Sequence, residues 1–171
     1  MNIPATFKKS DLAPSDEEIE WLWCWLQRNE VQNNAKNVLE FGCGITTLIL
    51  QDALHPQFLI SIEDYQPCID MVRKHLHRLN FAIFKNWTPV DKYEWNVVLV
   101  DSSSCGKWEE GYHRDMVVKA ILPHMAPDGI IILHDWKKVA SKRAKRVLDK
   151  EGWELLDACY TRNGWGIYAN T

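Results

Sequence analysis

The sequence of 171 residues lacks the marks of several protein classes. No apolar run approaches the roughly 20 residues that a membrane-spanning helix needs, and the polar stretch 1–10 lacks the apolar core of a signal peptide. The 20 Lys and Arg residues do not outnumber the 23 Asp and Glu residues, which argues against nucleic acid as the main ligand. We therefore expect a soluble, cytoplasmic protein with no membrane segment.

Paired cysteines are also missing. The five cysteines include no Cys-x-x-Cys pair and no zinc-finger spacing, and a chain of this size is not expected to rely on disulfides. No internal repeat or low-complexity stretch is visible. Because 46% of the residues are hydrophobic, most of the chain is not disordered, and its length suits a single domain over residues 1–171.

The pattern divides this domain into three segments. We expect a loose lead-in, an N-terminal helix and a larger core, over residues 1–14, 15–30 and 37–170. Ser15 and Glu18 form a capping-box pattern at the start of the helix. Trp21 and Trp25 widen its apolar stripe beyond one face, which favours a broadly buried helix. The alternative is a surface for a partner or for a homodimer.

The core alternates between short apolar runs and amphipathic stretches. Strands are expected at 38–41, 58–62, 81–84, 95–100 and 130–133, and helices at 45–54, 66–79, 111–125 and 139–150. This alternation predicts a Rossmann-like, doubly wound and mostly parallel α/β sheet with helices on both faces. The runs 153–160 and 165–169 are joined by only four residues, so they should form an antiparallel hairpin that completes seven strands.

A glycine-spaced turn follows the first strand of the core. Gly42 and Gly44 lack side chains, so a ligand can approach the backbone there, and the next helix points its free N–H groups the same way. Glu63 ends the second strand, 23 residues after the acidic Glu40 of the first. An acidic residue at about this spacing typically binds a ribose diol, with Asp64 as the neighbouring alternative.

The identity of the ribose-containing ligand follows from charge and from a missing glycine. A dinucleotide motif would have its third glycine at position 47, which is Thr47. Glu40 would also place a negative charge beside a pyrophosphate. S-adenosylmethionine has a ribose diol, an ammonium and a sulfonium but no phosphate, so it fits better. A nicotinamide-dependent oxidoreductase is the less favoured alternative.

These motifs together resemble class I S-adenosylmethionine-dependent methyltransferases. The resemblance covers residues 37–170 and rests on the motifs 40–44, 62–63, 97–101 and 127–135 and on the closing hairpin. It implies a cofactor site with Glu40, Gly42 and Gly44 at the methionine part, Glu63 or Asp64 at the ribose, Asn86 or Trp87 at the adenine, and Asp101 at the reacting end.

Candidate catalytic groups lie beyond the fourth and fifth strands. Asp101, His113 and His134 are candidate general bases, and Asp135 could orient His134. The long segment 102–114 is expected to be a loop that contacts the acceptor.

A divalent metal is an alternative at the same strand ends. Asp101 and Asp135 end neighbouring strands and would place two carboxylates near one cation, as in catechol O-methyltransferase-like enzymes. Those enzymes follow the second carboxylate with Asn, whereas this chain has Trp136, which cannot ligate a metal. Asp135 can alternatively cap the following helix.

The expected activity is S-adenosylmethionine-dependent methyl transfer to a small-molecule O or N acceptor. The first alternative is a catalytically silent module on the same fold that binds S-adenosylmethionine or a partner, because fold alone does not determine function.

Overall fold

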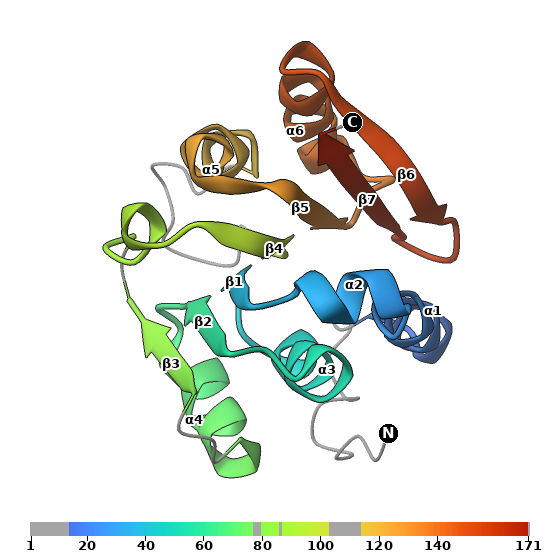
Figure 1. Ribbon diagram of the computed structural model, residues 1–171. Coiled ribbons are helices and arrows are strands. Elements are labelled where there is room, and N and C mark those ends of the chain that lie inside the picture. Colours follow the sequence, from blue (N-terminus) through green and yellow to red (C-terminus); the bar gives the residue numbers. More distant parts are fainter. Residues whose placement is uncertain (1–13, 77–79, 86, 103–113, 171) are drawn as a thin grey trace.

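The computed structural model describes residues 14–76, 80–85, 87–102 and 114–170. It contains a seven-stranded sheet in the order β3-β2-β1-β4-β5-β7-β6 (Figure 1). The strands are β1 Asn37–Phe41, β2 Phe58–Ile62, β3 Phe81–Phe84, β4 Trp95–Val100, β5 Met125–His134, β6 Trp153–Cys159 and β7 Trp165–Asn170. β1 to β5 run parallel, and β7 is antiparallel to both β5 and β6. The predicted fold class is confirmed.

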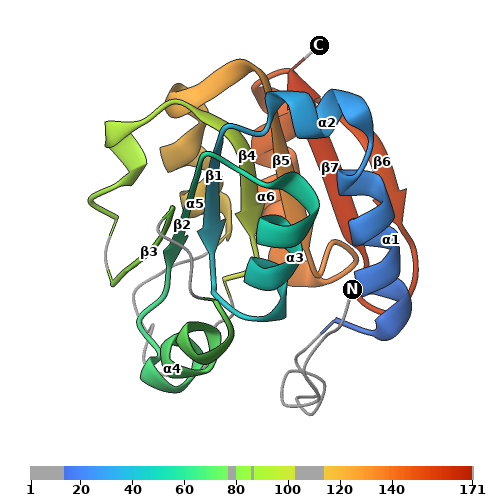
Figure 2. The same cartoon turned by 60° about the horizontal axis from the view of Figure 1, so that its bottom comes forward.

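Helices cover both faces of this sheet (Figure 2). They are α1 Asp16–Leu26, α2 Asn29–Asn34, α3 Ile45–Leu54, α4 Gln66–His75, α5 Arg114–Ile121 and α6 Val139–Lys150, with 3-10 turns η2 Val90–Lys92 and η3 Leu122–His124. The first four helices pack in one apolar cluster, and α5 and α6 pack in the other. Across the described ranges, the helices are all too short or too polar to cross a membrane.

β4 shows why the central strands are apolar on both sides. Its side chains alternate, so Val97 and Leu99 join the cluster under α1 and α3, while Val98 and Val100 join the cluster under α5. All four are buried. A strand covered on both faces cannot show the apolar-polar alternation of a half-exposed strand.

α1 is anchored to the closing hairpin through Glu18. The predicted capping box with Ser15 is present. The buried Glu18 carboxylate also accepts hydrogen bonds from the backbone N–H groups of Asn163 at 2.9 Å and Gly164 at 2.6 Å. The Trp165 indole donates to the Glu18 carbonyl at 3.0 Å. The first described helix is therefore attached to the last two strands.

The N-terminal helix differs from the prediction of one helix over 15–30. α1 ends at Leu26 and a second helix, α2, follows, because the backbone of Arg28 is extended between them. Trp25 is buried and its two tryptophan neighbours are half-buried against the same core. The helix is thus broadly buried, and a homodimer through it stays a prediction.

Three further boundaries were predicted wrongly. The helix expected over 66–79 is α4, which ends at His75 because the backbone of Leu76 is extended. The helix expected over 111–125 is α5 followed by η3, which begins with Pro123 in its first turn, because proline lacks the N–H that an α-helix needs. β5 starts at Met125 rather than at residue 130. Met125 pairs with Trp95 and Ile130 with Val97. Five residues of β5 therefore span the same length as two residues of β4, and residues 127–129 bulge from the strand.

Candidate functional site

The site residues lie at the carboxyl ends of the central parallel strands. β1 lies between β2 and β4, so the strand order reverses on either side of it. Gly42 follows β1 and Asp101 follows β4, while His134 ends β5 and pairs with Trp165 at the start of β7. A crevice at such a switch point is where open α/β sheets bind ligands.

The two glycines of the turn serve different purposes. Gly42 has a φ of +93°, and a Cβ there would lie 2.8 Å from the Asp101 carbonyl oxygen, so any side chain would clash with the end of β4. Gly44 has an extended backbone, and a Cβ there would meet nothing within 4 Å. Gly42 thus permits close packing of two strand ends, and Gly44 borders open space.

Glu63 lies against this turn. One carboxylate oxygen accepts the Cys43 N–H at 3.2 Å, and the other accepts the N–H groups of Asp64 at 2.9 Å and Tyr65 at 2.8 Å. Burial raises the pKa of Glu63 above its ordinary value, although these three donors partly offset the effect. The side chain joins the end of β2 to the glycine turn, whereas Asp64 is exposed.

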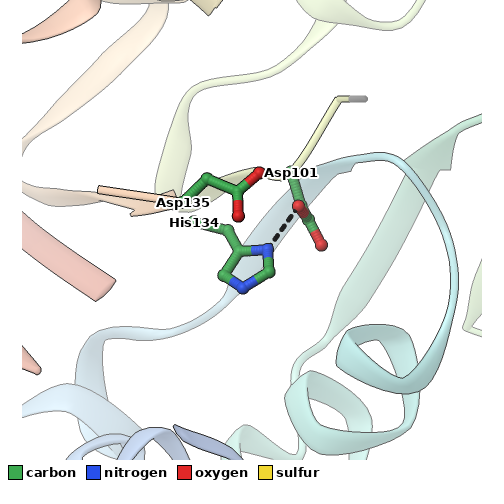
Figure 3. Close-up of side chains that lie close together, drawn as sticks. All are labelled: Asp101, His134 and Asp135. Carbon is green, nitrogen blue, oxygen red and sulfur yellow. Dashed lines mark hydrogen bonds and ion pairs between the residues drawn. The ribbon is translucent and has the colours of Figure 1, made fainter. Parts of the chain in front are cut away.

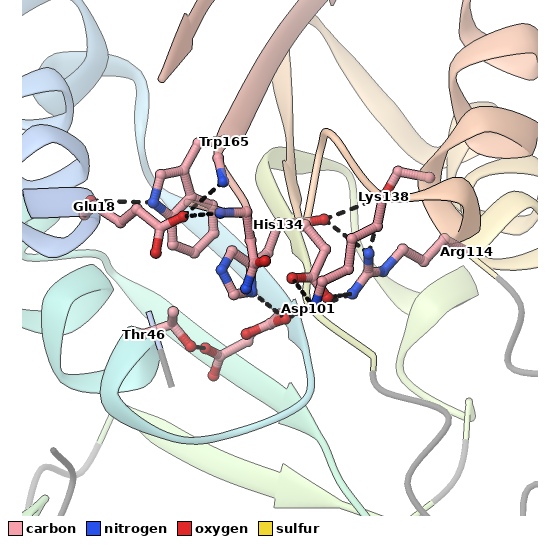
Figure 4. Close-up of polar contacts among 12 residues, drawn as sticks. Glu18, Thr46, Asp101, Arg114, His134, Lys138 and Trp165 are labelled. Atoms are coloured by element: carbon pink, nitrogen blue, oxygen red, sulfur yellow. Dashed lines mark hydrogen bonds and ion pairs between the residues drawn. The ribbon is translucent and has the colours of Figure 1, made fainter. Parts of the chain in front are cut away.

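Glu40 lies beneath the turn and is fully buried. Its carboxylate accepts hydrogen bonds from the hydroxyls of Thr46 (Figure 4), of Thr47 at 2.6 Å and of Ser61 at 2.6 Å. Thr47 also accepts the Gly44 N–H at 2.9 Å. Burial raises the pKa of Glu40 to about 7 against the opposing effect of the hydroxyls. These bonds give Glu40 a role in shaping the turn, and its contact with a cofactor ammonium stays a prediction.

The structure describes only one of the two predicted adenine contacts. The ring of Trp87 packs against Phe41 at the end of β1, with 5.1 Å between centroids. Asn86, and likewise the candidate base His113, lie outside the described residues.

The structure brings Asp101, His134 and Asp135 together (Figure 3). His134 Nδ1 lies 2.6 Å from Asp101 Oδ1, and one ligand atom from each of the three residues lies within 4.8 Å of the others. The His134 ring stacks on Trp165 with 4.2 Å between centroids. Among the described residues, His134 Nε2 is buried without a hydrogen-bond partner.

Arg114 is the residue of this cluster that the sequence interpretation missed. Its Nη1 donates to the His134 carbonyl at 2.9 Å and to Ser141 Oγ at 2.8 Å, and its Nη2 donates to Asp135 Oδ2 at 3.0 Å (Figure 4). Residues 103–113 of the expected loop lie outside the described residues, and Arg114 itself begins α5. Arg114 lies three, four and seven residues before the buried Val117, Val118 and Ile121. This spacing places it on the same helix face and could have indicated that it is buried.

The charges around the cluster shift the pKa values of Asp135 and His134 in opposite directions. Burial alone would raise the pKa of Asp135, but its partners Lys138, His134 and Arg114 lower it below its ordinary value. Burial alone would lower the pKa of His134, but the charge and hydrogen bond of Asp101 raise it. Asp135 is therefore held as a carboxylate, and Asp101 favours the protonated imidazole.

Comparisons with solved structures agree with this geometry. The O-methyltransferase of Bacillus cereus in complex with SAH superposes with a TM-score of 0.72 at 13% identity, over 98% of this chain and 86% of that one. The SAH-bound methyltransferase PaMTH1 of Podospora anserina gives 0.68 at 13% identity, over 98% and 83%. The precorrin 8w decarboxylase of Methanobacterium thermoautotrophicum gives 0.69 at 17% identity, over the full length of both chains.

This chain has the class I methyltransferase fold. No protein-family model matches it, and no curated protein matches its sequence. Two of these methyltransferases bind SAH, the demethylated form of S-adenosylmethionine, so a fit to that cofactor can be tested on this chain's own residues. The open space at Gly44 and the Glu63 carboxylate beside it suit the cofactor's methionine and ribose parts.

A divalent metal does not fit the side chains at this site. Asp101 and Asp135 converge as predicted for a metal site, but a guanidinium nitrogen of Arg114 lies 3.7 Å from one carboxylate and 3.0 Å from the other. Lys138 forms a further ion pair with Asp135 at 2.9 Å. No step below involves a metal.

Proposed function

We propose that this chain binds S-adenosylmethionine at the turn 42–44 and transfers its methyl group to an O or N atom of a small molecule. The observation that carries the proposal is the contact between Glu63 and the Cys43 N–H, beside the open space at Gly44. This contact joins an acidic residue suited to a ribose diol to a turn that a ligand can approach. SAH in two proteins of the same fold supports the choice of cofactor.

Glu63 would accept hydrogen bonds from the ribose hydroxyls. In the described part of the chain, Oε2 accepts only the Cys43 N–H, so one of its two lone pairs remains for a ligand, whereas Oε1 already accepts the N–H groups of Asp64 and Tyr65. The sulfonium of the bound cofactor supplies a methyl group that is already activated for displacement, so the protein's main task is positioning, which can lower a barrier by about 7–11 kcal/mol.

The pair of Asp101 and His134 would manage the acceptor's proton. In the neutral imidazole, Nδ1–H donates to Asp101 Oδ1 and orients the carboxylate, while Nε2 is buried away from the acceptor. As the acceptor's O or N atom bonds to the methyl carbon, its proton passes to the partly exposed Asp101 carboxylate. Trp165 holds the imidazole by stacking and is itself fixed by its indole bond to Glu18.

Calorimetry with S-adenosylmethionine and with SAH tests the binding step. Glu63→Ala should weaken both affinities at least about tenfold, which corresponds to about 1.4 kcal/mol. Asp64→Ala, which removes the exposed neighbouring carboxylate, is the matched control and should bind nearly as the wild type does. Absence of binding by the wild type, or tighter binding of a nicotinamide dinucleotide, would reject the proposal.

Formation of SAH with a panel of hydroxyl and amine acceptors tests the transfer step. Asp101→Asn should retain cofactor affinity and lose about 10²- to 10⁴-fold in rate, the range for a general base. A silent binding module predicts cofactor affinity with no turnover for any acceptor. Its expected partner surface on α1 is reduced by the burial of the tryptophans, so the enzyme is the better supported function.

A further inference from the structure

Asp101 and Asp135 form an arrangement that ordinarily attracts a divalent cation, yet cationic side chains of the chain itself occupy it. We infer that Arg114, assisted by Lys138, takes the structural place of a divalent metal at this site and excludes one. The inference concerns the same strand ends as the proposed methyl transfer, but it needs no turnover to be tested.

The position of the guanidinium carries the inference. Arg114 Nη2 is 3.0 Å from Asp135 Oδ2 and 3.7 Å from Asp101 Oδ1, so one nitrogen lies near both carboxylates. Arg114 Nη1 is fixed by the His134 carbonyl and Ser141 Oγ. With only 4% of its side chain exposed, Arg114 cannot swing into solvent to admit an ion without moving these partners.

The third candidate ligand is committed elsewhere. His134 Nδ1 and Asp101 Oδ1 lie 2.6 Å apart and share a hydrogen bond. Two ligand atoms at right angles around an ion such as Mg²⁺, each at about 2.1 Å, would lie about 3 Å apart with no proton between them. Metal binding would therefore require this hydrogen bond to break.

Charge balance agrees with the geometry. The two carboxylates face two permanent cations, Arg114 and Lys138, and so have no net charge to offer a dication. An additional double charge would be repelled by the buried guanidinium, and such repulsion is strong at a few ångströms in a partly desolvated site. Removing the guanidinium should convert the same side chains into a cation site.

The experiment is a titration with Mn²⁺ alone, in which electron paramagnetic resonance measures the free ion. The wild type should show no stoichiometric binding. Arg114→Gln, which removes the charge and keeps an amide donor, should bind Mn²⁺ at least about tenfold more tightly than the wild type. Asp135→Asn added to that variant should abolish the gain, and Arg114→Lys should restore exclusion. Arg28→Gln removes an arginine from the exposed ion pair with Asp157 and should bind as the wild type does.

Two results would overturn the inference. One is stoichiometric binding of Mn²⁺ by the wild type that Asp135→Asn removes. The other is an Arg114→Gln variant that melts cooperatively yet gains no affinity. If Arg114→Gln does not fold, Arg114→Met decides, because methionine removes the charge and fills much of the volume of the arginine stem. A gain in Mn²⁺ affinity supports the inference and no gain refutes it. Absence of methyl transfer by the wild type would count against the proposed function but not against this inference.

Discussion

Two carboxylates at the same end of the sheet, one buried and one partly buried, have opposite electrostatic environments. Glu40, in β1, is bonded by three neutral hydroxyls, and its pKa is raised to about 7. Asp135, after β5, is bonded by Arg114 and Lys138, and its pKa is lowered. Burial raises both, so the difference shows that neutral donors compensate only part of the desolvation of a charge, whereas cations reverse it.

The same contrast separates the two halves of the site. The partners of Glu40 lie 6, 7 and 21 residues away in the sequence, within two consecutive strand-helix units. Arg114 instead joins groups that lie 20, 21 and 27 residues further on, at the end of β5 and inside α6. The proposed cofactor half is built from neutral hydrogen bonds among β1, α3 and β2, and the proposed acceptor half includes ion pairs that join the start of α5 to the ends of β4 and β5.

Arg114→Ala should have the largest effect on stability. It leaves Asp135 without its buried partner and the His134 carbonyl without its donor, which should lower the free energy of unfolding by about 3–5 kcal/mol. Urea denaturation measures this loss. Arg28→Ala breaks an exposed ion pair and should cost about 1 kcal/mol or less, so equal losses in the two variants would contradict the comparison.

Glu40→Gln should change how stability depends on pH. The folded-state pKa of Glu40 is above its ordinary 4.5, so wild-type stability relative to this variant should fall as pH rises from about 4.5 to about 7. The total is on the order of 3 kcal/mol, at about 1.4 kcal/mol for each pKa unit. Denaturation curves across this pH range measure it.

Asp135→Asn should reveal a pH dependence of stability with the opposite sign. Because the folded-state pKa of Asp135 is lowered, its contribution is present above the ordinary pKa and is lost as pH falls through the folded-state value. Curves for Glu40→Gln and Asp135→Asn that change in the same direction relative to the wild type would refute the contrast.

Gly42→Ala and Gly44→Ala should separate the effect of the turn on stability from its effect on cofactor binding. Alanine at position 42 meets the Asp101 carbonyl in a left-handed backbone conformation, so it should cost about 1–3 kcal/mol of stability. Alanine at position 44 meets no neighbour and should change stability by only about 0.5 kcal/mol. It should still weaken S-adenosylmethionine binding, because its methyl group enters the open space. Thermal melts and calorimetry on both variants give the answer.

The smallest expected change is in the titration of His134. Asp101 raises the pKa of His134 against the effect of burial, so Asp101→Asn should move it downward. Nuclear magnetic resonance of the imidazole follows this directly, with the exposed His55 as internal reference. An unchanged or higher pKa of His134 would show that Asp101 does not control its protonation.

The sequence was sufficient for the parts of the fold that depend on local chemistry. The glycine turn, the capping box at Ser15 and the parallel core with its antiparallel hairpin follow from periodicity, backbone freedom and the rules of strand connection. Asp101 and Asp135 could be placed together because they follow neighbouring strands, whereas the orientation of His134 was assigned to Asp135 rather than to Asp101, which binds it. The proximity of the two aspartates follows from the pairing of the two strands.

The remaining features depend on contacts that local pattern does not encode. Arg114 could not be assigned because its partners belong to β5 and α6, and an arginine before an apolar stripe is equally compatible with an exposed helix start. Glu18 was interpreted only as a capping residue, although its carboxylate also binds the hairpin 145 residues away. The bulge in β5 depends on its pairing with β4.

The link between Glu18 and the hairpin has a consequence for biosynthesis. At about 5–20 residues per second, a ribosome needs about 7–30 s to add the 145 residues between Glu18 and Asn163. Throughout that interval the first helix has no hairpin to dock on, and its tryptophans have only part of their final packing. The packing of α1 is therefore completed only after the closing hairpin has been translated.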